Sequence, residues 1–159
     1  MSKRSFLREF FKANRMVGSV LPSSRFLSNK MLLPIAFEKA KVLIELNDAF
    51  FHDLQKKFQA PNMHLIHGSA ADISAVLQRL QLPKADYILS SLPLSNFPVA
   101  LRSAILEEVK QNMQPEGKLI QFQYSRGLKK LYGAHFDQVS IDYTVLNFPP
   151  AFIYTCTNS

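Results

Sequence analysis

The chain has 159 residues, of which 47% are apolar and 19% charged, enough apolar material for one sizeable core. Its single cysteine, Cys156, argues against a disulfide framework, and no Cys/His cluster has the spacing of a metal site. No run approaches the roughly 18 apolar residues of a membrane-spanning helix, and the N-terminus lacks the apolar stretch of a secretory signal. We therefore expect a globular protein without a metal, either soluble or peripheral on a membrane.

The net charge of +7 is concentrated at the start of the chain. Residues 1–30 contain seven Lys and Arg residues and one acid, so the remainder is close to neutral. Residues 3–17 separate apolar from basic side chains with a helical period, which predicts an amphipathic basic helix suited to a negatively charged partner. A mitochondrial transit peptide is the alternative with a similar composition.

Short apolar runs alternate with helical ones along the rest of the chain. After a turn near Pro22, a short helix is expected through about Leu33. The expected strands are 41–46, 63–67, 85–91 and 117–124, and the expected helices between them are 47–58, 72–81 and 97–113. This alternation predicts βαβ units and an α/β fold with a mostly parallel sheet. Two further extended segments, 136–143 and 145–155, predict an antiparallel pair at one edge.

Polar residues follow the first two strands at the edge where ligands of open parallel sheets collect. The first strand ends in ELND, residues 45–48, where an acid either accepts hydrogens from ribose hydroxyls or caps the next helix. The second strand ends in GSAAD, residues 68–72, whose small residues admit a planar ring. Asp72 either accepts a hydrogen from an amino group or caps the following helix.

The third and fourth strands end in segments of different character. The third is followed by SSLPLSNFP, residues 90–98, an uncharged loop whose backbone carbonyls could orient an amine, or which is a rigid turn. The fourth ends in QFQYSR, residues 121–126, where Tyr124 is either catalytic or a packing residue at the rim. The sequence contains no Ser/His/Asp set, paired carboxylates or phosphate loop, so hydrolysis and phosphoryl transfer have no support. A reaction at this site should therefore depend on how the substrates are positioned, rather than on a strong acid or base.

Seven segments in order carry a resemblance to a known family. They are VGSVLPSSR (17–25), ELND (45–48), GSAAD (68–72), SLPL with FP (91–94 and 97–98), PEGK (115–118), QFQY (121–124) and NFPPA (147–151). Together they resemble the bacterial phospholipid N-methyltransferases, which are class I S-adenosylmethionine-dependent methyltransferases close to the ribosomal RNA adenine dimethylases. The resemblance covers nearly the whole chain.

The resemblance implies a Rossmann-like sheet, S-adenosylmethionine as methyl donor and phosphatidylethanolamine or its methylated forms as acceptor. The cofactor residues that it implies are Glu45 for the ribose, Ala71 and Asp72 for the adenine, and Ser91 and Leu92 near the methyl group. The residues expected at the substrate are Pro93, Leu94 and Arg25, with Tyr124 as the candidate catalytic residue.

The resemblance also gives the basic N-terminal helix a role at the membrane. Its apolar side chains would enter the lipid interface while its cations meet anionic headgroups, each cation contributing about 1 kcal/mol. The membrane residues expected are Phe6, Phe10, Phe11, Arg8 and Lys12. The expected organisation is an N-terminal segment, 1–33, and a methyltransferase domain, 34–159. The protein would then be cytoplasmic and peripheral at the inner membrane face.

The chain departs from the family at the junction of its first strand and helix. The family places a glycine-rich loop, a helix and a strand here, and about 30 residues are missing relative to its pattern. Residues 34–46 resemble a first strand, whereas 45–58 resemble the end of a second strand and its helix. We expect strand 41–46 to take the first-strand position in a sheet of about six strands, because a lost central strand would leave unpaired edges. Cofactor binding would be impaired.

Three origins of this junction remain open: a natural deletion, an engineered chain, and a longer protein that has lost a segment from this sequence. Two alternative functions also remain. An RNA adenine methyltransferase would share the fold and the basic end, but usually has Asn or Asp before the proline of the third loop and an aromatic residue after it. This loop has Ser91-Leu92-Pro93-Leu94, so nucleic acid is the less favoured partner. A non-catalytic domain that binds membrane surfaces is the third candidate.

Overall fold

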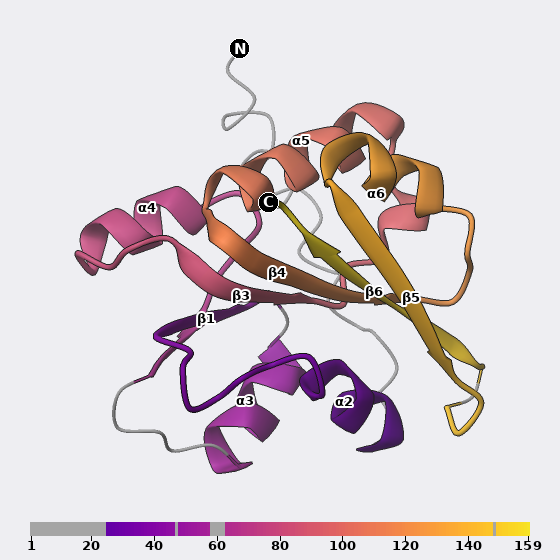
Figure 1. Cartoon of the computed structure of the whole chain (residues 1–159), viewed down its shortest axis with the longest axis horizontal. Helices are drawn as coiled ribbons and strands as arrows, with labels where there is room; N and C mark the ends of the chain where they lie inside the picture. Colours follow the sequence, from indigo (N-terminus) through magenta and orange to yellow (C-terminus); the bar gives the residue numbers. More distant parts are fainter. Residues whose placement is uncertain (1–24, 47, 58–62, 148) are drawn as a thin grey trace.

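The computed structural model describes residues 25–46, 48–57, 63–147 and 149–159, and its centre is a six-stranded sheet (Figure 1). The strand order is β2-β1-β3-β4-β6-β5. Strands β1 to β4 run parallel, whereas β6 runs antiparallel to both β4 and β5. The strands are β1 (Val42–Glu45), β2 (His64–His67), β3 (Ala85–Ser90), β4 (Met113–Gln123), β5 (Gln138–Thr144) and β6 (Ala151–Thr157). The expected mostly parallel α/β sheet with an antiparallel C-terminal edge is confirmed.

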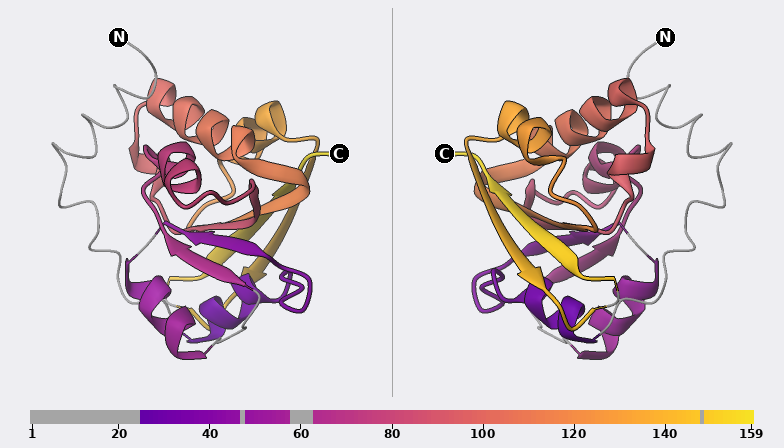
Figure 2. Two further views of the ribbon diagram at one scale, coloured as in Figure 1. Left: turned by 90° about the vertical axis from the view of Figure 1, so that its left-hand side faces the viewer. Right: turned by 90° about the vertical axis from the view of Figure 1, so that its right-hand side faces the viewer.

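Helices cover both faces of this sheet (Figures 1 and 2). They are α2 (Arg25–Leu32), α3 (Asp48–Lys57), α4 (Ile73–Arg79), α5 (Val99–Gln111) and α6 (Lys129–His135), with a 3₁₀ turn, η1 (Leu94–Asn96). In one core, Leu27 of α2 and Leu54 of α3 pack with Leu43 of β1. In the other, Leu101 of α5 and Tyr132 of α6 belong to the cluster that contains Ile44 and Leu119. The alternation of Leu43 and Ile44 between the two cores follows the period of two along a strand.

Strand β1 lies between β2 and β3 and pairs with both of them. Ile44 lies opposite Ile66 of β2 on one side and Ile88 of β3 on the other. All four residues of β1 are buried. A single strand therefore fills the space between β2 and β3 with parallel pairing on both sides, and the expectation of about six strands is confirmed. The assignment of strand 41–46 to the first-strand position of the family stays a prediction.

The structure differs from the sequence-based expectations in three places. The helix α6 was not predicted, although it places Tyr132 in the core. The last strand was predicted to begin at Val145, but β6 begins at Ala151, and residues 145–147 and 149 are bends rather than strand. Strand β4 begins at Met113 and contains an irregularity before Lys118, whereas the strand was expected from Gly117.

The predicted N-terminal basic helix lies outside the described residues, and so do Phe6, Arg8, Phe10, Phe11 and Lys12. The short helix expected before Leu33 is present as α2, and it packs on the sheet through Leu27 and Met31. No helix within the described ranges is long and apolar enough to cross a membrane. The predicted boundary at residue 33, between an N-terminal segment and a methyltransferase domain, stays a prediction.

Candidate functional site

The candidate site lies where the strand order reverses, beyond the carboxyl ends of β1 and β3. The chain leaves β1 through α3 on one face of the sheet and leaves β3 through η1 and α5 on the other (Figure 1). Pairing continues just past the strand ends, since the Leu46 N–H donates to the Leu89 carbonyl at 3.1 Å and the Gly68 N–H donates to the Glu45 carbonyl at 3.0 Å. Such a divergence is the usual ligand position in open α/β sheets.

On the β1 side of the site, the described residues form no cradle for a cofactor. Glu45 is 0% exposed and has the same orientation as Leu43, toward α2 and α3, so a ribose would reach it only after the covering residues moved. Helix α3 begins at Asp48, directly after the undescribed Asn47. The sequence has no glycine between Gly18 and Gly68, so no backbone here can approach a ligand as closely as a glycine loop does. The described residues on this side therefore offer the methionine half of S-adenosylmethionine no glycine loop.

The β2 side offers a small and partly open surface. Ala71 is buried and Asp72 half-buried at the start of α4. The Asp72 carboxylate makes no capping hydrogen bond to this helix. Instead, the Ser74 N–H donates to Glu108 Oε1 of α5 at 3.3 Å. The Asp72 side chain therefore does not cap α4 through a hydrogen bond, and its expected contact with adenine stays a prediction.

A pair of buried glutamines holds the loop after β3. The side-chain amides of Gln121 and Gln123 both donate to the Leu92 carbonyl at 2.8 Å, and the Leu94 N–H donates to the same oxygen. The Leu92 carbonyl is therefore not open to an amine, contrary to what the uncharged loop suggested. The role of these glutamines was not predicted, although two polar residues spaced by two on an otherwise buried strand indicate side chains that share a buried partner.

Ser91 contributes an unused hydroxyl beside this loop. The residue is 7% exposed, and its Oγ has no hydrogen-bond partner among the described residues. In contrast, the Oγ of Ser90 accepts the Leu92 N–H at 3.3 Å. Buried polar groups are nearly always hydrogen-bonded, so an unpaired hydroxyl at a strand end indicates a place for a polar ligand atom. Pro93 is half-buried at the rim, whereas Leu94 is fully buried in the core with α5.

Tyr124 packs at the rim on the other face of the sheet. Its ring lies edge-on to Phe122, with 5.7 Å between centroids, and it alternates with the two glutamines that point toward the loop. This arrangement favours the packing interpretation of Tyr124. Burial raises the pKa of Tyr132 and of Tyr154, so these phenols are neutral at physiological pH. A neutral phenol is not a base, so the polar groups described for this site are suited to holding substrates in position.

Two further features are Arg25 and an open depression. Arg25 begins α2, but its side chain lies outside the described residues, so its expected substrate contact stays a prediction. An open depression of about 180 Å³ lies at the opposite, amino edge of the sheet, where Lys39, Asp86 and Glu116 line it. No group of three metal-ligating side chains occurs in the part of the chain that the structure describes.

One curated relative resembles the chain over almost its full length. It is the ornithine lipid N-methyltransferase of Singulisphaera acidiphila, which is 27% identical over 179 aligned positions that cover 95% of this chain and 93% of the relative. Because the alignment is longer than the 159 residues of this chain, the relative has residues with no counterpart here. No protein-family model matches the chain.

Solved structures of methyltransferases share the fold. The T. thermophilus 16S rRNA N2 G1207 methyltransferase, in complex with AdoMet and guanosine, superposes with a TM-score of 0.56 at 13% identity, covering 91% of this chain and 45% of that one. The N-methyltransferase NodS of Bradyrhizobium japonicum gives 0.55 at 10% identity, covering 86% and 97% of the two chains. The chain therefore has the Rossmann-like fold of S-adenosylmethionine-dependent methyltransferases, as expected.

Proposed function

We propose that this protein transfers a methyl group from S-adenosylmethionine to the amine of a membrane-lipid headgroup. The observation that carries the proposal is the similarity to a lipid N-methyltransferase over 95% of the chain. The geometry agrees, because the loop of residues 90–98 at the strand-order reversal is uncharged and contains the buried Ser91 hydroxyl. Such a site suits a reaction that needs a nucleophile held in place.

Roles for the site residues follow from their positions. Bound S-adenosylmethionine supplies an electrophilic methyl group, so the protein has to orient the neutral amine toward it. We assign Ala71 and Asp72 to the adenine end of the donor, and Ser91 to a polar atom near the group that is transferred. Gln121 and Gln123 fix the loop by occupying the Leu92 carbonyl. We assign Glu45 to the ribose only in a conformation in which the residues that cover its side chain have moved.

Phosphatidylethanolamine or its methylated forms is the acceptor that we propose. The relative is named for ornithine lipid, which also carries a primary amine, so this lipid is the competing acceptor. Both substrates lie in a bilayer, and both would present an amine to the carboxyl edge of the sheet. We propose a protein that works peripherally at the inner face of the cytoplasmic membrane.

Two measurements on the full chain test the proposal. Calorimetry should detect binding of S-adenosylmethionine, and a radiolabelled methyl group should pass to vesicles containing phosphatidylethanolamine or ornithine lipid. Vesicles of phosphatidylcholine alone, which has no free amine, should remain unlabelled. Absence of both binding heat and labelled lipid would refute the methyltransferase function for this chain.

A non-catalytic domain that binds membrane surfaces is the second candidate. The observation that favours it is the β1 side of the site, where Glu45 is fully buried and no glycine loop precedes α3. This candidate predicts vesicle binding that weakens with salt and with Phe10→Asp, without any affinity for S-adenosylmethionine. Saturable methyl transfer would exclude it.

RNA adenine methylation has less support. The loop of residues 91–94 lacks the Asn or Asp and the stacking aromatic ring with which such enzymes hold a flipped base. Labelled methyl groups recovered in RNA instead of lipid would overturn this ranking.

A further inference from the structure

The turn between β5 and β6 exposes apolar side chains at the carboxyl edge of the sheet. We call this turn the hairpin tip, and its exposed members are Tyr143, Val145, Leu146, Pro149 and Pro150. Tyr143 is 59% exposed, Val145 67% and Leu146 60%. Because β6 runs antiparallel to β4, the tip lies at the edge where β4 ends, and it lies beside α2 (Figures 1 and 2). The candidate site opens on the same edge.

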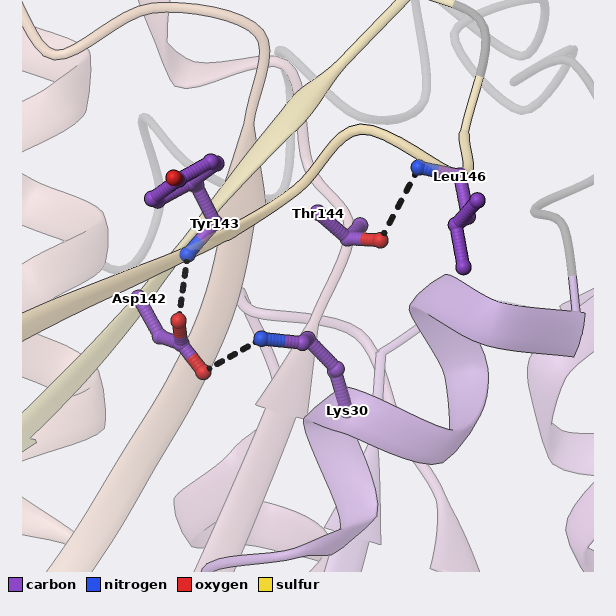
Figure 3. A network of polar contacts seen from close by, with 5 residues as sticks. All are labelled: Lys30, Asp142, Tyr143, Thr144 and Leu146. Atoms are coloured by element: carbon purple, nitrogen blue, oxygen red, sulfur yellow. Dashed lines mark hydrogen bonds and ion pairs between the residues drawn. The ribbon is translucent and has the colours of Figure 1, made fainter.

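Polar side chains brace this tip from within. The buried Thr144 accepts the Leu146 N–H at its Oγ1, at 3.3 Å, and the buried Asn147 donates from Nδ2 to the Pro149 carbonyl at 2.8 Å. Asp142 accepts the Tyr143 N–H at 2.8 Å and also pairs with Lys30 of α2 at 2.9 Å (Figure 3). The described residues of the tip are thus held by internal hydrogen bonds and present apolar groups outward, so folding has already met the cost of ordering them.

The surroundings of the tip are basic. The Arg126 guanidinium lies 6.0 Å from the centroid of the Phe152 ring, which in turn lies 6.4 Å from that of Tyr143. Residues 121–136 contain Arg126, Lys129 and Lys130, all exposed, and no acid. The acid nearest in sequence to the tip, Asp142, is paired with Lys30. The carboxyl edge near the tip therefore combines exposed apolar groups with the positive charge of Arg126.

We propose that the hairpin tip inserts into the interface of an anionic bilayer. An apolar turn that contains a tyrosine and has cations beside it matches the two parts of a membrane surface, acyl chains and anionic headgroups. The tip is a projecting turn, which suits a deformable bilayer. Insertion at this position turns the carboxyl edge toward the lipid, so a headgroup amine would reach the Ser91 loop while its acyl chains stay in the membrane. This role deepens the proposed function, but insertion itself needs no methyl donor.

A single tryptophan placed in the tip tests the insertion directly. The chain contains no tryptophan, so Leu146→Trp creates the one indole signal in the full-length protein. Vesicles containing phosphatidylglycerol should shift its emission to the blue, and brominated acyl chains should quench it. Leu80→Trp is the matched control, because Leu80 is 47% exposed at the end of α4, near the amino edge. Its emission should not change.

Vesicle affinity gives a second measurement. Leu146→Asp should weaken partitioning into these vesicles about tenfold, because an aspartate cannot bury the apolar area that leucine places in the lipid interface. Leu33→Asp, at an exposed leucine after α2, should leave it unchanged. The proposal is wrong if the protein sediments with vesicles while the Leu146→Trp emission stays constant, or if it does not bind them. It is also wrong if Leu146→Asp converts a dimer to a monomer without changing vesicle binding. Calorimetry with S-adenosylmethionine tests the proposed function separately.

Discussion

The amino and carboxyl edges of the sheet use their polar groups in different ways. At the amino edge, Asp86 Oδ2 accepts the N–H groups of Lys41 and Val42 at 2.8 and 2.9 Å, and Gln114 donates to the Lys84 carbonyl. At the carboxyl edge, the Ser91 hydroxyl has no partner among the described residues, and the hairpin tip exposes apolar side chains. These amino-edge side chains bond to the backbone of the protein, whereas the carboxyl edge, besides its own internal bonds, keeps a hydroxyl and apolar groups available for other molecules.

The two edges therefore divide stability and ligand binding between them. Substitutions at the amino edge should lower the free energy of unfolding and leave ligand binding intact in the folded fraction. Substitutions at the carboxyl edge should do the reverse. The division fits the general behaviour of open α/β sheets, whose ligands collect beyond the carboxyl ends of strands.

Gly117→Ala should have the largest effect on stability. A Cβ atom at this position would lie 2.8 Å from the Gln114 carbonyl oxygen and 3.1 Å from that of Ala85, both of them backbone atoms. We expect a loss of about 3 kcal/mol in urea unfolding, at the upper end of overpacking costs. Gly133→Ala in α6 is the control, because nothing lies within 4 Å of its Cβ, and it should stabilise the protein by up to about 1 kcal/mol. Equal stabilities for the two variants would contradict this account.

Asp86→Ala should have the next largest effect. It removes the acceptor of two backbone N–H groups that lead into β1, and leaving such donors without a partner costs about 2 kcal/mol. Asp86→Asn keeps an acceptor oxygen and should retain most of the stability. Chemical unfolding of both variants measures the difference. The interpretation fails if Asp86→Asn is as unstable as Asp86→Ala.

The sequence predicts the parallel half of the fold well, because its alternating strand and helix periods are strong there. It fails at the C-terminal half for local reasons. Helix α6 has only seven residues, including Gly133, and forms because Tyr132 packs on Tyr154 with 4.6 Å between ring centroids. Val145 and Leu146 resemble a strand, but the following prolines cannot donate ladder bonds and Asn147 bonds to the Pro149 carbonyl.

The site is predictable to a lesser extent. Strand ends indicate Asp72 and Ser91, since polar residues after buried strands are visible in the sequence. The hydrogen bonds to the Leu92 carbonyl cannot be predicted from the sequence, because the donors Gln121 and Gln123 come from a different strand. The burial of Glu45 is equally hard to predict, because the sequence does not show which helices will cover an acid at a strand end.

Ser91→Ala tests the carboxyl edge. Removing a buried hydroxyl without a partner should change the free energy of unfolding by less than about 0.5 kcal/mol, or raise it. If this hydroxyl binds the donor, affinity for S-adenosylmethionine should fall about tenfold, the equivalent of one good hydrogen bond. Ser95→Ala, on the exposed turn η1, should change neither quantity. A stability loss without an affinity loss would place Ser91 with the structural residues.

The ion pair between Lys30 and Asp142 should have the smallest effect, although it lies next to the hairpin tip. The hydrogen bond from Lys30 and then that from the Tyr143 N–H lower the pKa of Asp142. Because the folded pKa lies below the unfolded one, the stabilising contribution is complete above the unfolded value of about 3.9 and disappears as the pH falls through the folded value. Both side chains are partly exposed, so solvent screening limits the contribution to about 0.5 kcal/mol. Lys30→Gln should therefore be slightly less stable than the parent chain at pH 7 and equal to it in acid. A difference that persists in acid would show that Lys30 stabilises the tip through packing, and the carboxyl edge would then contribute more to stability than this ion pair alone.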